Sequence, residues 1–130
     1  MVAYNFQNQF ADDVESGKKT QTIRKRGKKN PPSVGCRIQL YTGMRTKNCR
    51  LLCTPVCTSV EVIEIRSHFK HVLIGTPSGD SYQFNRLTDT TIEKLAKDDG
   101  FESAEAFFEY FKTGRGDYFS GFLIRWEPIK

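Results

Sequence analysis

Three stretches of the chain place hydrophobic residues three or four apart, which is the spacing of a helix with one buried face. The first covers Gln9 to Ser16, where Phe10 and Val14 share a face and Gly17 is suited to end the helix. The other two follow residues that can cap a helix N-terminus. One runs from Asp89 to Gly100, with apolar positions Ile92, Leu95 and Ala96. The other runs from Ser103 to Gly114, with apolar positions Ala106, Phe107, Tyr110 and Phe111.

Elsewhere the pattern is that of β-strands, with alternating or β-branched hydrophobic residues. Pro77 to Asp80 is a hairpin turn signal between two such runs. In the closing strand, Phe122, Ile124 and Trp126 are expected on one face. The predicted strands lie within Ala3–Gln7, Thr20–Arg24, Cys36–Tyr41, Arg50–Ile65, Val72–Ile74, Tyr82–Phe84 and Phe119–Trp126.

These elements predict an α+β fold. We expect a small, mostly antiparallel sheet, closed into a β-barrel, with two or three short flanking helices. The 130 residues contain no internal repeat and no linker long enough to divide them, so a single domain over residues 1–130 is expected. No apolar run approaches the roughly 18 residues of a membrane span, and residues 1–10 do not resemble a secretory signal.

Charge is distributed unevenly along the chain. Residues 1–50 carry 11 basic and 3 acidic side chains, a net charge of +8, whereas residues 51–130 carry 9 and 12, a net charge of −3. Between Gly17 and Lys29 there are seven lysines and arginines and no acid. Such a cluster attracts anionic partners, of which nucleic-acid phosphates are the commonest. A solvated basic loop with no partner is the alternative.

The run Gly17-Lys18-Lys19-Thr20-Gln21-Thr22-Ile23-Arg24 follows a predicted helix and opens a predicted strand. It resembles the signature of the ASCH domain family, Gly-x-Lys-x-x-Glu-x-Arg, with Thr22 in place of the usual Glu. The triplet Asp99-Gly100-Phe101 and the closing strand extend the resemblance over nearly the whole chain. It implies a PUA-like β-barrel and RNA binding, and some members of the family are hydrolases.

Small bacterial ASCH proteins that hydrolyse N4-acetylcytidine also carry Thr at this position, and their catalytic set is a Lys, that Thr and a distant Glu. The resemblance therefore implies catalytic roles for Lys19 and Thr22. The acid would fall near Asp99, which is shorter than Glu, with Asp98 and Glu102 as competing candidates.

The residues themselves set conditions on this chemistry. Amide hydrolysis needs a nucleophile, a base and donors for the oxyanion. Lys19 acts as the base for Thr22 only if its pKa falls by roughly 3 units from about 10.4. Residues three apart in a straight strand point to opposite faces, so the two meet only if the chain turns after Gly17. An ordinary strand threonine is the alternative reading of Thr22.

Four further residues are candidates for binding a nucleoside or RNA. Arg24 shares a strand face with Thr22 and can hold a phosphate or a base carbonyl; a surface ion pair is its alternative. Tyr41, Arg45 and Lys47, with Arg50, are expected to meet around one loop. An aromatic ring among several cations is typical of sites for single-stranded nucleic acid, although a plain polar loop is also consistent.

The cysteines indicate no metal site. Cys49, Cys53 and Cys57 are four apart in one run, whereas structural zinc usually takes pairs separated by a longer span. With Cys36, they are predicted to be reduced thiols of a cytoplasmic protein, packed as small buried side chains. His68 and His71 lack the Glu of a His-Glu-x-x-His helix and are predicted to be surface or core residues. No metal and no cofactor is expected.

Three classes of function stay open. The first is a module that recognises RNA or a modified nucleoside in a basic cleft. The second is an amidohydrolase acting on N4-acylated cytidine, and a ribonuclease is less favoured because no histidine pair is placed for acid–base cleavage. The third is an adaptor that docks a partner through its acidic helices. A membrane partner is not expected, and the sequence leaves the oligomeric state open.

Overall fold

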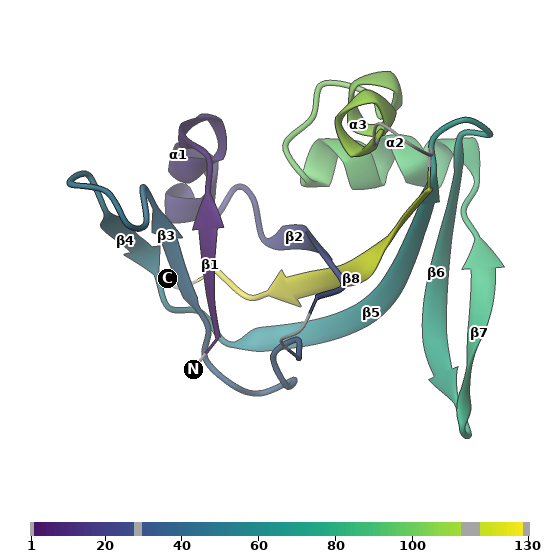
Figure 1. Ribbon diagram of the computed structural model, residues 1–130, viewed down its shortest axis with the longest axis horizontal. Coiled ribbons are helices and arrows are strands. Elements are labelled where there is room, and N and C mark those ends of the chain that lie inside the picture. The colour runs from purple at the N-terminus through teal and green to yellow at the C-terminus, as the bar shows by residue number, and fades with distance from the viewer. Residues whose placement is uncertain (1, 28–29, 113–117, 129–130) are drawn as a thin grey trace. The chain divides into compact units, whose positions relative to one another are not determined.

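A computed structural model describes residues 2–27, 30–112 and 118–128 (Figure 1). The described residues form three helices and eight strands in mostly antiparallel sheets, which confirms the α+β class and the short helices. None of the described helices has the length and apolar character needed to cross a bilayer. The elements are β1 (Ala3–Phe6), α1 (Asn8–Ser16), β2 (Gln21–Lys25), β3 (Gln39–Thr42), β4 (Arg50–Cys53), β5 (Cys57–Arg66), β6 (His71–Ser78), β7 (Ser81–Arg86), α2 (Asp89–Asp98), α3 (Ala104–Phe111) and β8 (Tyr118–Trp126).

The strands form two sheets. One has the order β1-β3-β4, and the other has the order β2-β8-β5-β6-β7. The chain divides into two compact units, the first made of residues 1–22, 30–60 and 124–130 and the second of residues 23–29 and 61–123. Strands β2, β5 and β8 contribute residues to both units. A closed barrel and a single domain stay predictions.

In the first unit, α1 packs against the three-stranded sheet (Figure 1). Phe10, Ala11 and Val14 form its buried face, as the spacing predicts. β1 and β3 are parallel, with Phe6 opposite Thr42, and β3 pairs with β4 in antiparallel fashion. Two parallel strands end at the same edge of a sheet, so the segments that follow Phe6 and Thr42 start side by side.

The second unit has a core of aliphatic and aromatic side chains. Phe107, Phe108 and Phe111 of α3 are buried in it together with Ile92, Leu95 and Ala96 of α2. Two predictions change in detail, and a third cannot be compared with the structure. Phe108 is buried and Tyr110 is exposed, because a stripe that includes residues 107, 108 and 111 leaves position 110 outside. The N-cap of α2 is Thr88, whose hydroxyl accepts from the Thr91 N–H, and Asp89 is the first helical residue. Gly114 lies outside the described residues.

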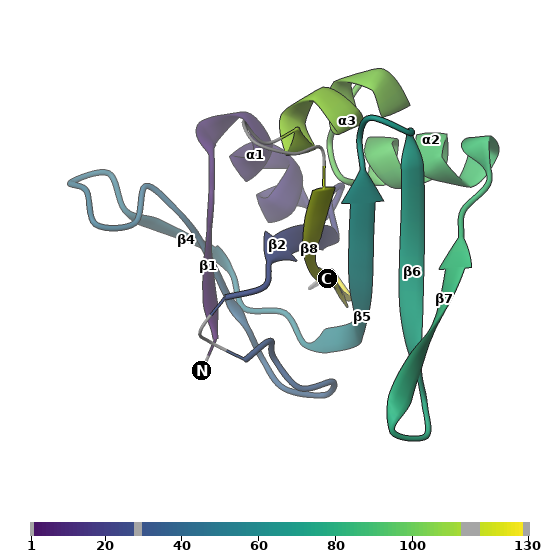
Figure 2. The same cartoon turned by 45° about the vertical axis from the view of Figure 1, so that its right-hand side comes forward.

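The β6–β7 hairpin turns at Gly79–Asp80, where the sequence predicts it, and Gly79 takes a left-handed φ of 63° (Figure 2). The closing strand β8 differs from its prediction. Leu123 and Ile124 are both buried, whereas Phe122 is only half-buried with its ring 5.3 Å from the Arg26 guanidinium. The buried residues therefore move from odd-numbered positions, up to residue 123, to even-numbered positions, from residue 124. This switch occurs where the chain leaves the second unit for the first.

Candidate functional site

The motif that resembles ASCH domains begins with a turn. Gly17 ends α1 in the left-handed conformation, at φ 84°, and its N–H bonds to the carbonyl oxygen of Val14. The Lys19 N–H then bonds to the Asp13 carbonyl oxygen at 2.8 Å. β2 begins only at Gln21, so Lys19 lies before the strand and Thr22 within it. The strand geometry that would point these two side chains to opposite faces therefore does not apply.

Lys19 is a buried cation among aromatic rings. Only 3% of the residue is exposed, and its Nζ lies 5.1 Å from the Phe10 ring centroid and 6.0 Å from that of Phe6. Ring faces attract an ammonium group, and more strongly when water is excluded. Burying a charge is costly unless it has partners. Lys19 has such contacts, and a buried lysine held by them is a candidate for binding or catalysis rather than a solubilising surface charge.

Polar side chains that follow Lys19 in the chain, and one on β3, are also buried. Gln21 and Thr22 are almost fully covered, as is Thr42 of β3. The Thr42 hydroxyl donates to the Phe6 carbonyl oxygen at 2.7 Å and lies 3.3 Å from Asn8 Oδ1. Lys19 and Thr42 thus both adjoin Phe6, at the carboxyl end of β1. Among the described residues, every buried side-chain nitrogen and oxygen has a hydrogen-bond partner. The polar groups here are held in place.

The three acids proposed for the third catalytic position differ in burial. Asp99, which ends α2, is 5% exposed. Asp98 is exposed and bonds to Lys94 Nζ at 2.8 Å, one helical turn away, and Glu102 is exposed. Perturbed catalytic carboxyls are characteristically buried, which favours Asp99 among the three. Asp99 belongs to the second unit, whereas Lys19 and Thr22 belong to the first.

Residues 43–49 connect β3 to β4 and carry exposed cations. Gly43 and Arg45 both take left-handed φ values, 65° and 66°. The Met44 N–H donates to Asn5 Oδ1 at 2.9 Å, which ties this loop to β1. Arg45 and Lys47 are exposed and form no ion pair within the described part of the chain.

The other predicted binding residues have different surroundings. Tyr41 of β3 is half-buried, and its hydroxyl lies 3.5 Å from Gln39 Oε1. Arg24 of β2 is also half-buried and is counted with the second unit. Arg50 opens β4 and pairs with Glu15 at 2.6 Å. Arg50 is thus engaged by α1, and the prediction that it joins the cations of the loop stays a prediction.

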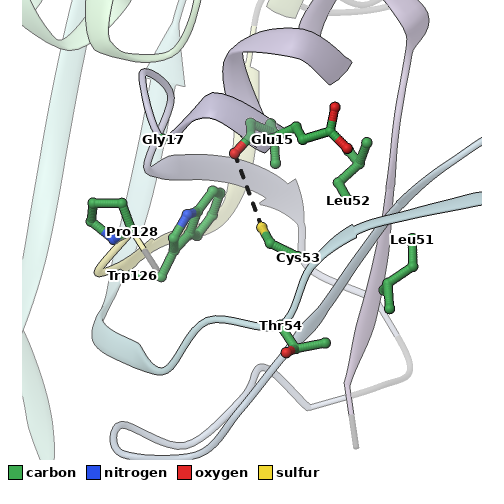
Figure 3. A pocket seen from close by; sticks show the side chains of 9 residues that line it. Glu15, Gly17, Leu51, Leu52, Cys53, Thr54, Trp126 and Pro128 are labelled. Carbon is green, nitrogen blue, oxygen red and sulfur yellow. Dashed lines mark hydrogen bonds between the residues drawn. The ribbon is translucent and has the colours of Figure 1, made fainter. Parts of the chain in front are cut away.

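A pocket of about 340 Å³ lies in the first unit (Figure 3). The Trp126 indole and Pro128 lie on one side of it, and Cys53 lies on the other. Gly17 is also part of the lining, and a Cβ atom there would come within 2.9 Å of Pro128 Cβ. None of the predicted site residues lines this pocket, although Gly17 opens the motif that contains Lys19 and Thr22. Sequence reasoning did not find it, because its walls come from α1, β4 and β8, and only Gly17 carried a signal.

The four cysteines differ in burial, contrary to the prediction. Cys57 is buried and Cys53 is half-buried, whereas Cys36 and Cys49 are exposed, so the prediction of four buried thiols is wrong for those two. Pro55 separates β4 from β5 and thereby breaks the equal spacing. Burial, and secondarily the charge of Glu15, raises the pKa of Cys53, and burial raises the pKa of Cys57. No group of three or more metal-ligating side chains gathers in the described residues.

Comparisons with protein-family models, with curated proteins and with solved structures found no match to this chain. The geometry of the residues themselves is therefore what supports a function.

Proposed function

We propose that this chain binds a modified nucleoside, or the RNA that carries it, at the carboxyl edge of β1 and β3. Two kinds of cation that adjoin the ends of these two strands carry the proposal. Lys19 is buried against Phe6, the last residue of β1, and Arg45 and Lys47 are exposed on the loop that follows β3. An ASCH-type domain with a PUA-like barrel in a cytoplasmic protein belongs to the same proposal.

Buried Lys19 is suited to bind the base of such a ligand, and exposed Arg45 and Lys47 are suited to bind its phosphates. A buried lysine can donate to a small polar group such as a base carbonyl or an acyl oxygen. Exposed Arg45 and Lys47 suit the phosphates on either side of that base, because flexible cations neutralise a backbone without reading its sequence. Tyr41 of β3 supplies an aromatic face next to this loop in the chain.

The test is binding of N4-acetylcytidine and of a short single-stranded RNA carrying one such base. The chain has one tryptophan, Trp126, whose ring packs edge-on at 6.2 Å from that of Phe6, so its fluorescence reports on this region. The double variant Arg45→Ala/Lys47→Ala should weaken RNA binding and flatten its salt dependence. Lys94→Ala/Lys97→Ala, which removes the same charge from the exposed face of α2, is the matched control. Equal RNA binding by both double variants would refute the proposed edge.

A second candidate function is hydrolysis of the amide of an N4-acylated cytidine. The observation that favours it is the position of Lys19 before β2, together with the burial of Lys19 and Thr22. The Thr22 oxygen would form a bond to the acyl carbon while its proton passes to neutral Lys19. The carbon–nitrogen bond would then break, with the proton returned to the leaving amine, and water would hydrolyse the acyl-threonine.

Release of cytidine from N4-acetylcytidine tests this second function. Thr22→Val keeps the side-chain shape and removes the hydroxyl, and Lys19→Met keeps most of the length and removes the amine. Each should lower the rate by about a hundredfold or more. Thr22→Ser should retain turnover, and Lys18→Met, which changes the exposed neighbouring lysine, is the control. Full activity in Thr22→Val would exclude Thr22 as the nucleophile.

A further inference from the structure

The turn between β5 and β6 combines rings with positive charge. Residues 66–71 read Arg-Ser-His-Phe-Lys-His and contain no acid. Phe69 at its tip is 66% exposed, the highest value among the exposed large hydrophobic side chains of the described residues. A phenylalanine in water forgoes the stabilisation that burial would bring. An exposed ring within a basic segment is therefore a candidate contact for a partner.

This turn is anchored, so Phe69 is held outward. The buried Ser67 hydroxyl donates to the Phe108 carbonyl oxygen of α3 at 3.0 Å. The Lys70 N–H bonds to the Ser67 carbonyl oxygen at 3.2 Å, and Lys70 takes a left-handed φ of 56°. Lys70 Nζ lies 5.6 Å from the centroid of the buried Phe108 ring. Figure 2 shows this turn at the helix-bearing end of the β5–β6 hairpin.

Aromatic rings gather around Phe69. Its ring stacks on that of His71, with centroids 5.9 Å apart and planes at 27°, and meets His68 edge-on at 5.0 Å. Tyr118 of β8, which is 50% exposed, lines the same hollow of about 330 Å³ together with Phe69, His68 and Arg66. The Tyr118 hydroxyl donates to the Glu64 carboxylate, which raises the pKa of Tyr118 and fixes its ring.

The charge around these rings is positive. The Arg66 guanidinium lies 6.0 Å from the Tyr118 ring centroid, and Arg86 Nη1 lies 3.3 Å from His71 Nε2. The carboxylate of Glu64 accepts from the Tyr118 hydroxyl and lies 4.0 Å from the Arg66 guanidinium. The Phe69–Tyr118 surface consists of Arg66, His68, Phe69, Lys70, His71, Arg86 and Tyr118.

We propose that the Phe69–Tyr118 surface binds single-stranded nucleic acid, with bases stacked on Phe69 and Tyr118 and phosphates held by Arg66, Lys70 and Arg86. Every base presents a flat face, and proteins that bind single strands combine a cationic track with aromatic rings in this way. An acidic peptide would use the cations but would leave two exposed rings without a role. This surface shares no residue with the site at the β1–β3 edge, so the two proposals can be tested separately.

The test is fluorescence anisotropy with labelled ten-nucleotide poly-U RNA and poly-dT DNA at about 50 mM salt. Phe69→Ala and Tyr118→Ala should each raise Kd by roughly 5- to 100-fold. Tyr118→Phe should bind nearly as the wild type does, because the ring remains. Tyr82→Ala removes a ring of matching exposure, 49%, from β7 and is the control. Thermal unfolding checks that each variant is folded.

The outcomes separate this inference from the proposed function. Loss of affinity in Phe69→Ala and Tyr118→Ala, with none in Tyr82→Ala, would support it. Photocrosslinking of 5-iodouridine oligomers to the peptide that contains residues 66–71 would locate the contact. Wild-type affinity in both alanine variants, or no binding of either oligomer by the wild type, would overturn it. If only Arg45→Ala/Lys47→Ala weakened binding, the proposed function would gain support and this inference would be refuted.

Discussion

In the second unit, the backbone of β2 leaves no room for a side chain at Gly121 of β8. A Cβ atom there would lie 2.1 Å from the Arg24 carbonyl oxygen and 2.9 Å from its carbonyl carbon. These are backbone atoms of β2, so no side-chain rotation can relieve the contact. Gly121→Ala must therefore push β2 away from β8, and β2 carries both Thr22 and Arg24.

The size of the effect follows from the distances. Ordinary van der Waals contact begins at 3.4 Å, so the separation must grow by about 3.4 − 2.1 = 1.3 Å. The Arg26 N–H bond to the Ser120 carbonyl oxygen is already 3.1 Å long and would be lost. Overpacking costs about 1–3 kcal/mol and each lost hydrogen bond about 1 kcal/mol. We expect Gly121→Ala to lower the free energy of unfolding by about 3 kcal/mol.

Urea denaturation and thermal unfolding followed by circular dichroism measure this loss. A reduction of about 3 kcal/mol corresponds to a Tm lower by roughly 10–15 °C for a chain of this size. Gly27→Ala is the matched control, since a Cβ atom at Gly27 meets nothing within 4 Å, and it should stay within about 0.5 kcal/mol of the wild type. A Gly121→Ala variant less than 1 kcal/mol below the wild type would refute the assigned pairing of β2 with β8.

Three further substitutions test other parts of the structure. Gly43→Ala places a Cβ atom 2.7 Å from the Asn48 carbonyl oxygen, at a residue with a left-handed φ. Urea denaturation should therefore show a free energy of unfolding lower by about 1–3 kcal/mol. An unchanged denaturation midpoint would contradict the loop geometry. Ser67→Ala leaves a carbonyl of α3 without its donor and should cost about 1–2 kcal/mol by the same measurement; a smaller cost would mean that the β5–β6 turn is not anchored there. Glu15→Gln removes a negative charge that raises the pKa of Cys53, so more of the Cys53 thiolate should be present at pH 8. Alkylation of Cys53, followed by mass spectrometry, should then be faster than in the wild type. A slower reaction would mean that Glu15 does not raise this pKa.

Local sequence signals predicted much of the fold because local chemistry determined those elements. Gly17 ends α1, Ser103 caps α3, and Gly79 turns the β6–β7 hairpin, each through a backbone or capping preference of its own residue type. The cap of α2 was predicted one residue late because Thr88 and Asp89 are both good caps, and nothing local chooses between them.

Features that depend on tertiary packing could not be predicted from local sequence patterns. Period-two alternation predicts one buried face for a strand, but β8 changes its buried face between Leu123 and Ile124. A single alternation cannot describe a strand that contributes to two units. Cysteine burial was mispredicted for a related reason, since thiols are compatible with either environment and the surrounding elements decide.

At the candidate site, sequence reasoning identified residue types but not their burial. Arg24 and Lys19 are both cations of the same motif, yet Lys19 is buried between rings and Arg24 is half-exposed. Asp98 and Asp99 are adjacent and chemically identical, and only the end of α2 makes one an exposed ion-pair partner and the other a buried acid. Burial is decided by packing between segments distant in sequence, which periodicity does not describe.

Ionic strength is the variable that separates the two kinds of contact proposed for the β1–β3 edge. Exposed charges are screened within about 10 Å at 0.1 M salt, so phosphate binding at Arg45 and Lys47 should weaken steeply as salt rises. Lys19 is 3% exposed and adjoins the rings of Phe6 and Phe10, where salt has little access. Recognition of a free nucleoside through Lys19 should therefore depend little on salt. If nucleoside and RNA binding fell in parallel with added salt, the exposed cations alone would account for both, and the buried lysine would have a purely structural role.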